Sequence, residues 1–335
     1  MNIKIISFTQ DGARLAEKAA AFFRARGDAA KSVRGSGADK VVLRDWTAEA
    51  FQSADALIFV GAAGIAVRAI APHVVSKLSD PAVVVLSEDG RFAVPLLSGH
   101  LGGANELAAE LAAAFGMEPV LTTGTDVRGL FAVDVWASRQ GLVIRNPGRI
   151  KLVSARLLAG GEIRIRSDWP LLGEPPQGVL PVRQGACEVR VTAAACPEET
   201  ALLLTPRVLA LGVGCRRGIP AGAVRGAAEA ILAKTGLSGA ALRGVFSIDL
   251  KRDEPGLREF CEAWGLPFQT ASAEQLNAVP GVFTGSEFVK KTTGTDCVCE
   301  RSALWGCPGG RLVCPKQTQN GVTAALAACE PDLHF

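Results

Sequence analysis

Residues 55–70 read DALIFVGAAGIAVRAI, and this stretch decides how the first part of the chain folds. The run Asp55–Val60 is almost wholly apolar, as expected of a strand that is buried on both faces of a sheet. A glycine turn at 61–64 follows, and 65–70 has helical character that ends before Pro72. A buried strand that leads through a tight turn into a helix is the unit of parallel α/β sheets.

The same alternation continues on both sides of this segment. We expect strands at 3–8, 40–43, 82–86 and 91–97, and helices at 12–26 and 104–115. The last two of these strands join through Asp89-Gly90, which is typical of a β-hairpin. Residues 1–135 are therefore predicted to form an N-terminal α/β domain.

Two further parts follow along the chain. Residues 136–206 are rich in Gly, Pro and Arg and hold only short strand-like stretches, which indicates a small β-leaning middle module or linker. Residues 207–335 return to alternating strands and helices and end in a hairpin-like segment. The predicted fold class is α/β, with two α/β domains joined by the middle module. A length of 335 residues fits this division at roughly 150 residues per domain.

Composition argues against several classes of protein. Lys and Arg number 36 against 33 Asp and Glu, so the formal charge of +3 does not draw the whole chain to nucleic acid or to an anionic membrane. No apolar run approaches the roughly 20 residues of a membrane span, and the first residues read as a strand rather than a secretory signal. Nine cysteines at irregular spacing do not resemble a secreted disulfide framework, so we expect a cytoplasmic protein with reduced thiols.

The segment 97–106 is the first candidate for a functional site. Its glycines would let backbone N–H groups approach a ligand, and the helix after it would favour a carboxylate or phosphate at its N-terminus. His100, one of three histidines, could exchange protons near neutral pH. The alternative is a tight turn in which His100 satisfies a backbone carbonyl. The candidate residues of this segment are Ser98, Gly99, His100, Gly102, Gly103, Asn105 and Glu106.

Two further candidates lie where predicted strands end. Gly64 opens a helix whose Arg68 could reach an anion, unless the turn serves only close packing and the arginine is solvated. Cys215 precedes Arg216 and Arg217, whose guanidinium groups can hold carboxylates. Two adjacent cations would lower the pKa of the Cys215 thiol, although no histidine is near in sequence to act as its base.

The C-terminal part carries the remaining polar candidates. Asp249 and Lys251 would leave a strand on the same side, or form a solvated charged turn. Glu300 begins a helix-like run and would suit a general base if it were partly buried. The alternative is ordinary charge on an amphipathic helix. Ser286, Glu287 and Lys316 complete this set.

The late cysteines suggest a metal site as a competing interpretation. Their positions, 297, 299, 307 and 314, have neither the paired spacing of structural zinc sites nor that of iron–sulfur clusters. Buried thiols that act as small apolar side chains explain these cysteines better.

In their order along the chain these motifs resemble the cobalt-precorrin-5A hydrolase family (CbiG) of anaerobic cobalamin biosynthesis. The resemblance covers most of the chain outside the middle module, and Ser98–Glu106 is its most specific piece. The C-terminal part also resembles a stand-alone protein of the aerobic route, while cysteines at 297, 307 and 314 depart from the family pattern. The matching stretches are 64–68, 80–85, 96–107, 125–126, 131–134, 212–218, 247–255, 272–274, 286–289, 298–300 and 313–316.

The resemblance implies a reaction and its participants. Water would open the δ-lactone of a cobalt corrinoid, cobalt-precorrin-5A, and acetaldehyde would leave to give cobalt-precorrin-5B. The cobalt would arrive within the substrate, so no cofactor or protein metal site is expected. We expect His100 as the base, with Glu106 and Glu300 behind it, and backbone N–H groups of 98–103 as an oxyanion hole. The residues expected to bind the carboxylate-rich substrate are Gly64, Arg68, Ser98, Gly99, Gly102, Gly103, Asn105, Cys215, Arg216, Arg217, Asp249, Lys251, Ser286, Glu287 and Lys316.

The expected partner is thus a small-molecule corrinoid, with neither nucleic acid nor membrane. A homodimer and transient contacts with neighbouring pathway enzymes stay open. Three other functions also stay open: a corrinoid-binding or delivery protein without chemistry, an α/β enzyme for a phosphate ligand, and a zinc or redox protein built on the late cysteines. The absence of a Gly-x4-Gly-Lys-Ser/Thr loop argues against the second.

Overall fold

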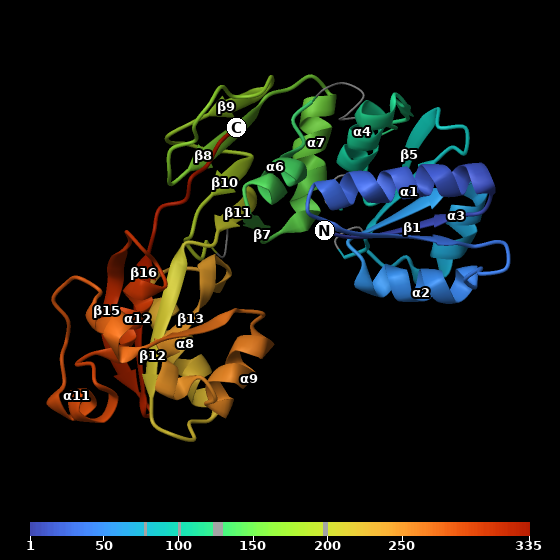
Figure 1. Ribbon diagram of the computed structural model, residues 1–335. Coiled ribbons are helices and arrows are strands. Elements are labelled where there is room, and N and C mark those ends of the chain that lie inside the picture. The colour runs from blue at the N-terminus through green and yellow to red at the C-terminus, as the bar shows by residue number, and fades with distance from the viewer. Residues whose placement is uncertain (77–78, 100–101, 123–129, 197–199) are drawn as a thin grey trace. The chain divides into compact units, whose positions relative to one another are not determined.

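A computed structural model describes residues 1–76, 79–99, 102–122, 130–196 and 200–335. Its contacts divide the chain into two compact units, Met1–Val135 and Trp136–Phe335 (Figure 1). The predicted middle module and C-terminal domain therefore lie within one unit. Among the described residues, no helix has the length and apolar character needed to cross a bilayer.

The described part of the first unit contains a six-stranded sheet with the order β2-β1-β3-β4-β5-β6. Neighbouring strands run parallel except β4 and β5, which form the predicted hairpin. The strands are β1 (Asn2–Ser7), β2 (Ala29–Arg34), β3 (Ala56–Val60), β4 (Ala82–Leu86), β5 (Phe92–Leu97) and β6 (Glu118–Pro119). The helices are α1 (Gln10–Ala25), α2 (Leu43–Ser53), α3 (Ala63–Ile70), the 3-10 turn η1 (Ala71–His73) and α4 (Ala104–Phe115).

Helices cover both faces of this sheet (Figure 1). Alternate residues of a strand point to opposite faces, so Ile5 packs with α1 and α4 while Ile6 packs with α2 and α3. All of β3 is buried, which confirms the reading of the run that opens at Asp55.

The strand predicted at 40–43 is wrong. The second strand of the sheet is β2, at Ala29–Arg34, and Leu43 begins α2. β2 lies at the sheet edge and is nowhere fully buried, so its polar sequence lacks the apolar run by which the other strands are recognised.

The second unit begins with a smaller sheet, in the order β7-β11-β10-β8-β9. Its strands are β7 (Leu142–Ile144), β8 (Ile163–Ser167), β9 (Val179–Pro181), β10 (Val189–Val191) and β11 (Leu202–Pro206). Its helices are α6 (Val133–Arg139), which crosses the unit boundary, the 3-10 turn η2 (Pro147–Arg149) and α7 (Ile150–Leu158). The strands β8 to β11 are the short strand-like stretches expected in this part of the chain, whereas α6, α7 and β7 were not expected. Ile150, Val153 and Leu157 give α7 a buried face at helical spacing, a signal that was present in the sequence.

The larger sheet of this unit has the order β14-β13-β12-β16-β15. Its strands are β12 (Leu209–Cys215), β13 (Leu242–Ile248), β14 (Phe268–Ala271), β15 (Arg311–Gln319) and β16 (Val322–Ala328). Its helices are α8 (Ala221–Thr235), η3 (Gly239–Ala241), η4 (Asp249–Lys251), α9 (Pro255–Ala263), α10 (Ala273–Asn277), α11 (Glu287–Thr293) and α12 (Val298–Trp305). One core cluster joins α8 and α9 to the sheet, and a separate cluster joins α12 to it.

Backbone contacts explain why the two sheets belong to one unit. Ala195 donates its N–H to the Gly236 carbonyl at 2.9 Å, and Ser238 donates to Ala193 at 2.8 Å. The chain end also returns to the smaller sheet, where the Trp136 ring N–H donates to the His334 carbonyl at 2.6 Å and the Trp136 ring stacks on Phe335.

Candidate functional site

A cavity of about 650 Å³ lies at the carboxyl ends of β12 and β13. Its walls are completed by α11, by the start of α12 and by the β15–β16 hairpin. This is the place where open α/β sheets usually bind their ligands, and the volume is that of a small-molecule site. Four of the predicted cationic residues line it together: Arg216, Arg217, Lys251 and Lys316.

Two glycines of β12 let α12 form one wall. A Cβ on Gly212 would lie 1.9 Å from the Cys299 carbonyl oxygen and 2.5 Å from the Ala303 nitrogen. A Cβ on Gly214 would lie 2.7 Å from the Thr323 hydroxyl, which donates to the Gly214 carbonyl. The Gly-x-Gly pattern in this strand therefore serves close packing of α12 and the hairpin.

The cations that line the cavity differ in their partners. Within the described residues, Arg216, Arg217 and Lys316 form no ion pair. The Lys251 ammonium lies 2.9 Å from the buried Glu254 carboxylate, so its charge is largely compensated. The unpaired cations are therefore the ones suited to hold a carboxylate ligand.

Glu254 holds Lys251 and the turn at 218–219 in place. Its carboxylate also accepts backbone N–H bonds from Gly218 at 2.6 Å and Ile219 at 3.2 Å. Burial raises the pKa of Glu254, but the bonds from Lys251 and from these N–H groups outweigh burial and leave the pKa lowered. The N–H groups at this turn are consequently occupied by the protein itself.

The hairpin turn positions Arg216. Asn320 and Gly321 both have positive φ, 49° and 79°, as a tight hairpin turn requires. The Gly321 carbonyl accepts from the Arg216 N–H, and a Cβ at Gly321 would lie 3.3 Å from the Arg216 Cδ. Glycine is needed here both for the turn and for the passage of the arginine stem.

Glu300 is almost fully buried, with 1% of its surface exposed. Its carboxylate accepts from the Thr284 N–H at 2.7 Å, the Thr284 hydroxyl at 3.0 Å, the Lys316 N–H at 2.8 Å and the Cys297 thiol at 3.5 Å. Burial raises the pKa of Glu300, yet these bonds together lower it. A carboxylate so enclosed and so readily ionised is poorly suited to the base role expected from the sequence; it ties α12, β15 and a loop together.

Cys215 does not have the lowered pKa that the sequence predicts. Burial raises the pKa of the Cys215 thiol to about 11, and the charge of Lys251 offsets only part of this. The predicted lowering of this pKa is wrong, because desolvation outweighs the nearby cations. Cys299 donates toward Cys297, which lowers the pKa of Cys297 and raises that of Cys299. Within the described residues no three His, Cys, Asp or Glu side chains form a metal-binding group.

Three other C-terminal candidates lie outside the cavity lining. Asp249 starts η4, Ser286 caps α11 by accepting from the Val289 N–H, and Glu287 is exposed in the first turn of α11. The lining instead includes apolar side chains that are not among the predicted binding residues, such as Leu250 and Phe288. Only the fold brings these residues to the cavity.

In the first unit, the turn that starts at Ser98 is tightly packed. Ser98 has φ 56° and donates its hydroxyl to the Asp80 carbonyl at 2.9 Å. A Cβ on Gly99 would lie 2.8 Å from the Asn105 amide oxygen, and one on Gly102 would lie 2.3 Å from the Ser98 Cβ. Packing of the turn explains these two glycines, and their ligand role stays a prediction.

Other predicted residues of this turn are less constrained. Gly103 caps α4 with a left-handed φ of 81°, and Glu106 lies on the exposed side of the first helical turn. His100, and the Thr125-Asp126 pair of the resemblance, lie outside the described residues. The base role of His100 therefore stays a prediction.

The glycine turn at 61–64 and the turn that starts at Ser98 lie at opposite edges of the first sheet. The Gly61 N–H bonds to the Leu86 carbonyl, so Gly64 follows at the carboxyl edge of the parallel strands. β5 runs antiparallel to β4 and pairs Leu97 with Val83, so Ser98 lies at the opposite edge. Arg68 is exposed on α3.

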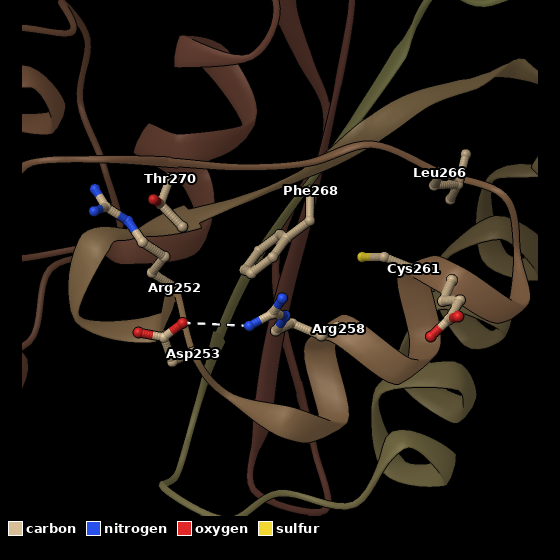
Figure 2. Close-up of a pocket in the computed structure, with 8 residues that line it drawn as sticks. Arg252, Asp253, Arg258, Cys261, Leu266, Phe268 and Thr270 are labelled. Carbon is tan, nitrogen blue, oxygen red and sulfur yellow. Dashed lines mark hydrogen bonds and ion pairs between the residues drawn. The ribbon is translucent and has the colours of Figure 1, made fainter.

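A second hollow, of about 760 Å³, runs along α9 and β14 (Figure 2). Figure 2 shows Arg258 beside Asp253, with their nitrogen and oxygen 3.4 Å apart. Cys261 faces the same hollow, and burial raises the pKa of its thiol to about 12. The first cavity brings together three cations without an ion pair, whereas among the described residues Arg252 is the only such cation on this hollow, so we favour the first cavity as the functional site.

Comparisons with known proteins cover most of the chain. Three family models match in order: Cobalamin synthesis G N-terminal over 45–126, Cobalamin biosynthesis central region over 131–211, and Cobalamin synthesis G C-terminus over 209–327. The chain belongs to the CbiG family. Every residue that lines the cavity lies within the C-terminal match of the CbiG models.

Relatives of the CbiG family extend the match. A Salmonella typhimurium strain LT2 protein named cobalt-precorrin-5A hydrolase is 36% identical over 83% of each chain. A Priestia megaterium protein of the same name is 34% identical over 83% of this chain and 79% of its own. The crystal structure of a cobalamin biosynthesis protein G homolog from Sulfolobus solfataricus covers 98% of this chain and 97% of its own, at 22% identity and a TM-score of 0.42.

Proposed function

We propose that this chain hydrolyses the δ-lactone of cobalt-precorrin-5A, with loss of acetaldehyde, to give cobalt-precorrin-5B in cobalamin biosynthesis. The observation that carries the proposal is the identity of 36% over 83% of the chain to a protein named for this reaction, with all three CbiG regions present in order. The corrinoid substrate is the chain's proposed small-molecule partner, and its cobalt is part of the substrate.

The cavity has the charge that such a substrate requires. A corrinoid of this kind carries several acetate and propionate arms around an apolar ring. Arg216, Arg217 and Lys316 offer unpaired cations to those arms, and a guanidinium group can bind one carboxylate through two hydrogen bonds. The charge of the cavity therefore supports binding of the corrinoid substrate.

The chemical half needs a base and an acceptor of negative charge. Water adds to the lactone carbonyl, whose oxygen becomes negative, and the lactone C–O bond breaks to give a carboxylate and a hydroxyl. Loss of a proton from that hydroxyl then lets the adjacent C–C bond break, which releases acetaldehyde and leaves the electron pair of that bond in the conjugated macrocycle. Asp296 is the one Asp or Glu of the described lining, and it is paired with Arg301 at 2.7 Å. His100 stays our proposed base.

Anaerobic incubation of the purified chain with cobalt-precorrin-5A tests this proposal. We expect one acetaldehyde for each lactone opened, measured by an alcohol dehydrogenase that oxidises NADH. The corrinoid product should gain the mass of water and lose that of acetaldehyde. Binding of the corrinoid without any acetaldehyde would contradict the proposal and favour the delivery protein instead.

The proposal also includes a cytoplasmic location. Its support is the composition, with nine cysteines at spacings unlike those of secreted disulfide frameworks. Fractionation of the native host cells, with the chain detected by antibody, tests it.

A further inference from the structure

Two large apolar side chains on the cavity are left in contact with solvent. Leu250 is 65% exposed and Phe288 is 77% exposed, and both line the cavity. They come from different elements, since Leu250 lies in η4 after β13 and Phe288 lies in α11. Single exposed apolar residues are common, but two on the wall of one cavity need an explanation.

The helix that carries Phe288 has little core of its own. None of the residues of α11 is fully buried, and its seven residues are too few for a stable isolated helix. It is held by the Ser286 cap, by a left-handed Gly294 at its end, and by Val289, which is partly buried against the small core cluster that contains Ile248 and Val298. The apolar surface of Phe288 is thus presented to the cavity rather than used for folding.

The cations on the same cavity indicate what covers this surface. Arg216, Arg217 and Lys316 suit carboxylate arms, whereas Leu250 and Phe288 suit an apolar plane. A ligand that satisfies both must join a broad apolar surface to several peripheral carboxylates. A tetrapyrrole ring with carboxylate arms has this chemistry, whereas a small polycarboxylate or a nucleotide does not.

We infer that Leu250 and Phe288 contact the face of the macrocycle and make the cavity specific for a ring rather than for carboxylates alone. The inference rests on the proposed function, because that function supplies the tetrapyrrole. Phe288 acts here by stacking and Leu250 by apolar contact, and neither takes part in proton transfer.

Binding of cobyrinic acid, a stable cobalt corrin with carboxylate arms, provides the test. We expect Phe288→Ala to raise its dissociation constant about tenfold or more in absorbance titrations of the full-length chain, and Leu250→Ala to raise it several-fold. Phe288→Tyr keeps the aromatic face and should restore most of the affinity. Val282→Ala is the matched control, since Val282 is 98% exposed but does not line the cavity.

Kinetics separate this role from a structural one. With cobalt-precorrin-5A, Phe288→Ala should raise KM and change kcat little, while circular dichroism and melting temperature match those of Val282→Ala. Wild-type affinity in both Phe288→Ala and Leu250→Ala would overturn the inference. So would a self-association of the wild type that Phe288→Ala abolishes while corrin binding is unchanged, because the side chain would then serve a second copy.

The outcomes distinguish the inference from the function on which it rests. If the wild type releases acetaldehyde but Phe288→Ala and Leu250→Ala both bind cobyrinic acid and turn over normally, the inference fails and the function stands. If Phe288→Ala weakens cobyrinic acid binding but the wild type releases no acetaldehyde, the ring contact stands and the hydrolase proposal fails.

Discussion

Lys251 and Lys316 carry the same charge on the same cavity, yet their partners give them different roles. Lys251 lies 2.9 Å from the buried Glu254 carboxylate, while Lys316 forms no ion pair among the described residues. A cation that lies beside a carboxylate attracts a ligand anion only weakly, because the charge of the carboxylate repels that anion. At the scale of single residues, the unpaired Arg216, Arg217 and Lys316 are therefore the better candidates for binding.

The arginine pair gives the first prediction at this scale. Arg216→Ala/Arg217→Ala should weaken binding of cobyrinic acid at least about tenfold, because a hydrogen bond between charged groups contributes roughly 1.5–3 kcal/mol. The dependence of affinity on salt should also become shallower. Arg225→Ala, on an exposed position of α8, is the control. Equal affinities of the two variants would show that the pair does not hold the ligand.

The proposed base, His100, gives the second prediction at the scale of residues. His100→Ala should lower kcat for lactone opening by about 100-fold or more, the usual contribution of a general base. His73→Ala is the control, because His73 lies on η1 and its ring contacts Phe51. The measurement is the initial rate of acetaldehyde release at saturating cobalt-precorrin-5A. A wild-type rate in His100→Ala would make the base assignment wrong.

At the scale of elements, glycines decide how closely α12 lies on β12. Gly212→Ala should lower the free energy of unfolding by about 2–3 kcal/mol, because the new Cβ would meet backbone atoms of Cys299 and Ala303 that cannot move alone. Gly222→Ala, on α8, meets no atom within 4 Å and should be neutral or slightly stabilising. Urea denaturation measures both, and equal stabilities would contradict the packing argument.

Glu300 holds elements together and gives a prediction about pH. Its pKa is lowered in the folded chain, so its contribution to stability is present above the unfolded pKa and is lost as pH falls through the folded value. Glu300→Gln should therefore cost about 2 kcal/mol or more at neutral pH, and the difference from wild type should shrink in acid. Urea denaturation across pH measures this.

The control for this prediction is Glu259→Gln, at an exposed position of α9. It should change stability little at any pH, since surface charges contribute little. If Glu300→Gln were as stable as this control at neutral pH, the hydrogen bonds of the Glu300 carboxylate would not stabilise the fold as we expect.

Elements with continuous apolar runs were predictable, whereas β2 and α6 were not. β3 and β4 are buried along their whole length, so the apolar runs in their sequences predict them. β2 and α6 have mixed sequences, since β2 lies at the edge of its sheet and α6 crosses the unit boundary. Their structure depends on neighbours that are distant along the chain.

At the scale of the whole molecule, the parts that the sequence separates are not the compact units that the structure forms. The larger sheet of the second unit has its own strands, core and cavity, which is why residues 207–335 read as a domain. The chain end nevertheless returns to the smaller sheet through Leu172, whose N–H donates to Leu333. Such long-range bonds join the predicted middle and C-terminal parts into one unit, and no local pattern could reveal them.

The sequence by itself determined the α/β class, most of the buried strands and the family, because local apolar runs and short motifs suffice for these. It also selected the arginines of the cavity, since guanidinium groups after a strand indicate an anion site. Only the tertiary structure decided which charges are paired, that Glu300 is enclosed, and that Leu250 and Phe288 share a wall with Arg216. The physical reason is that burial and pairing depend on residues far apart in the chain, which meet only when the sheets form.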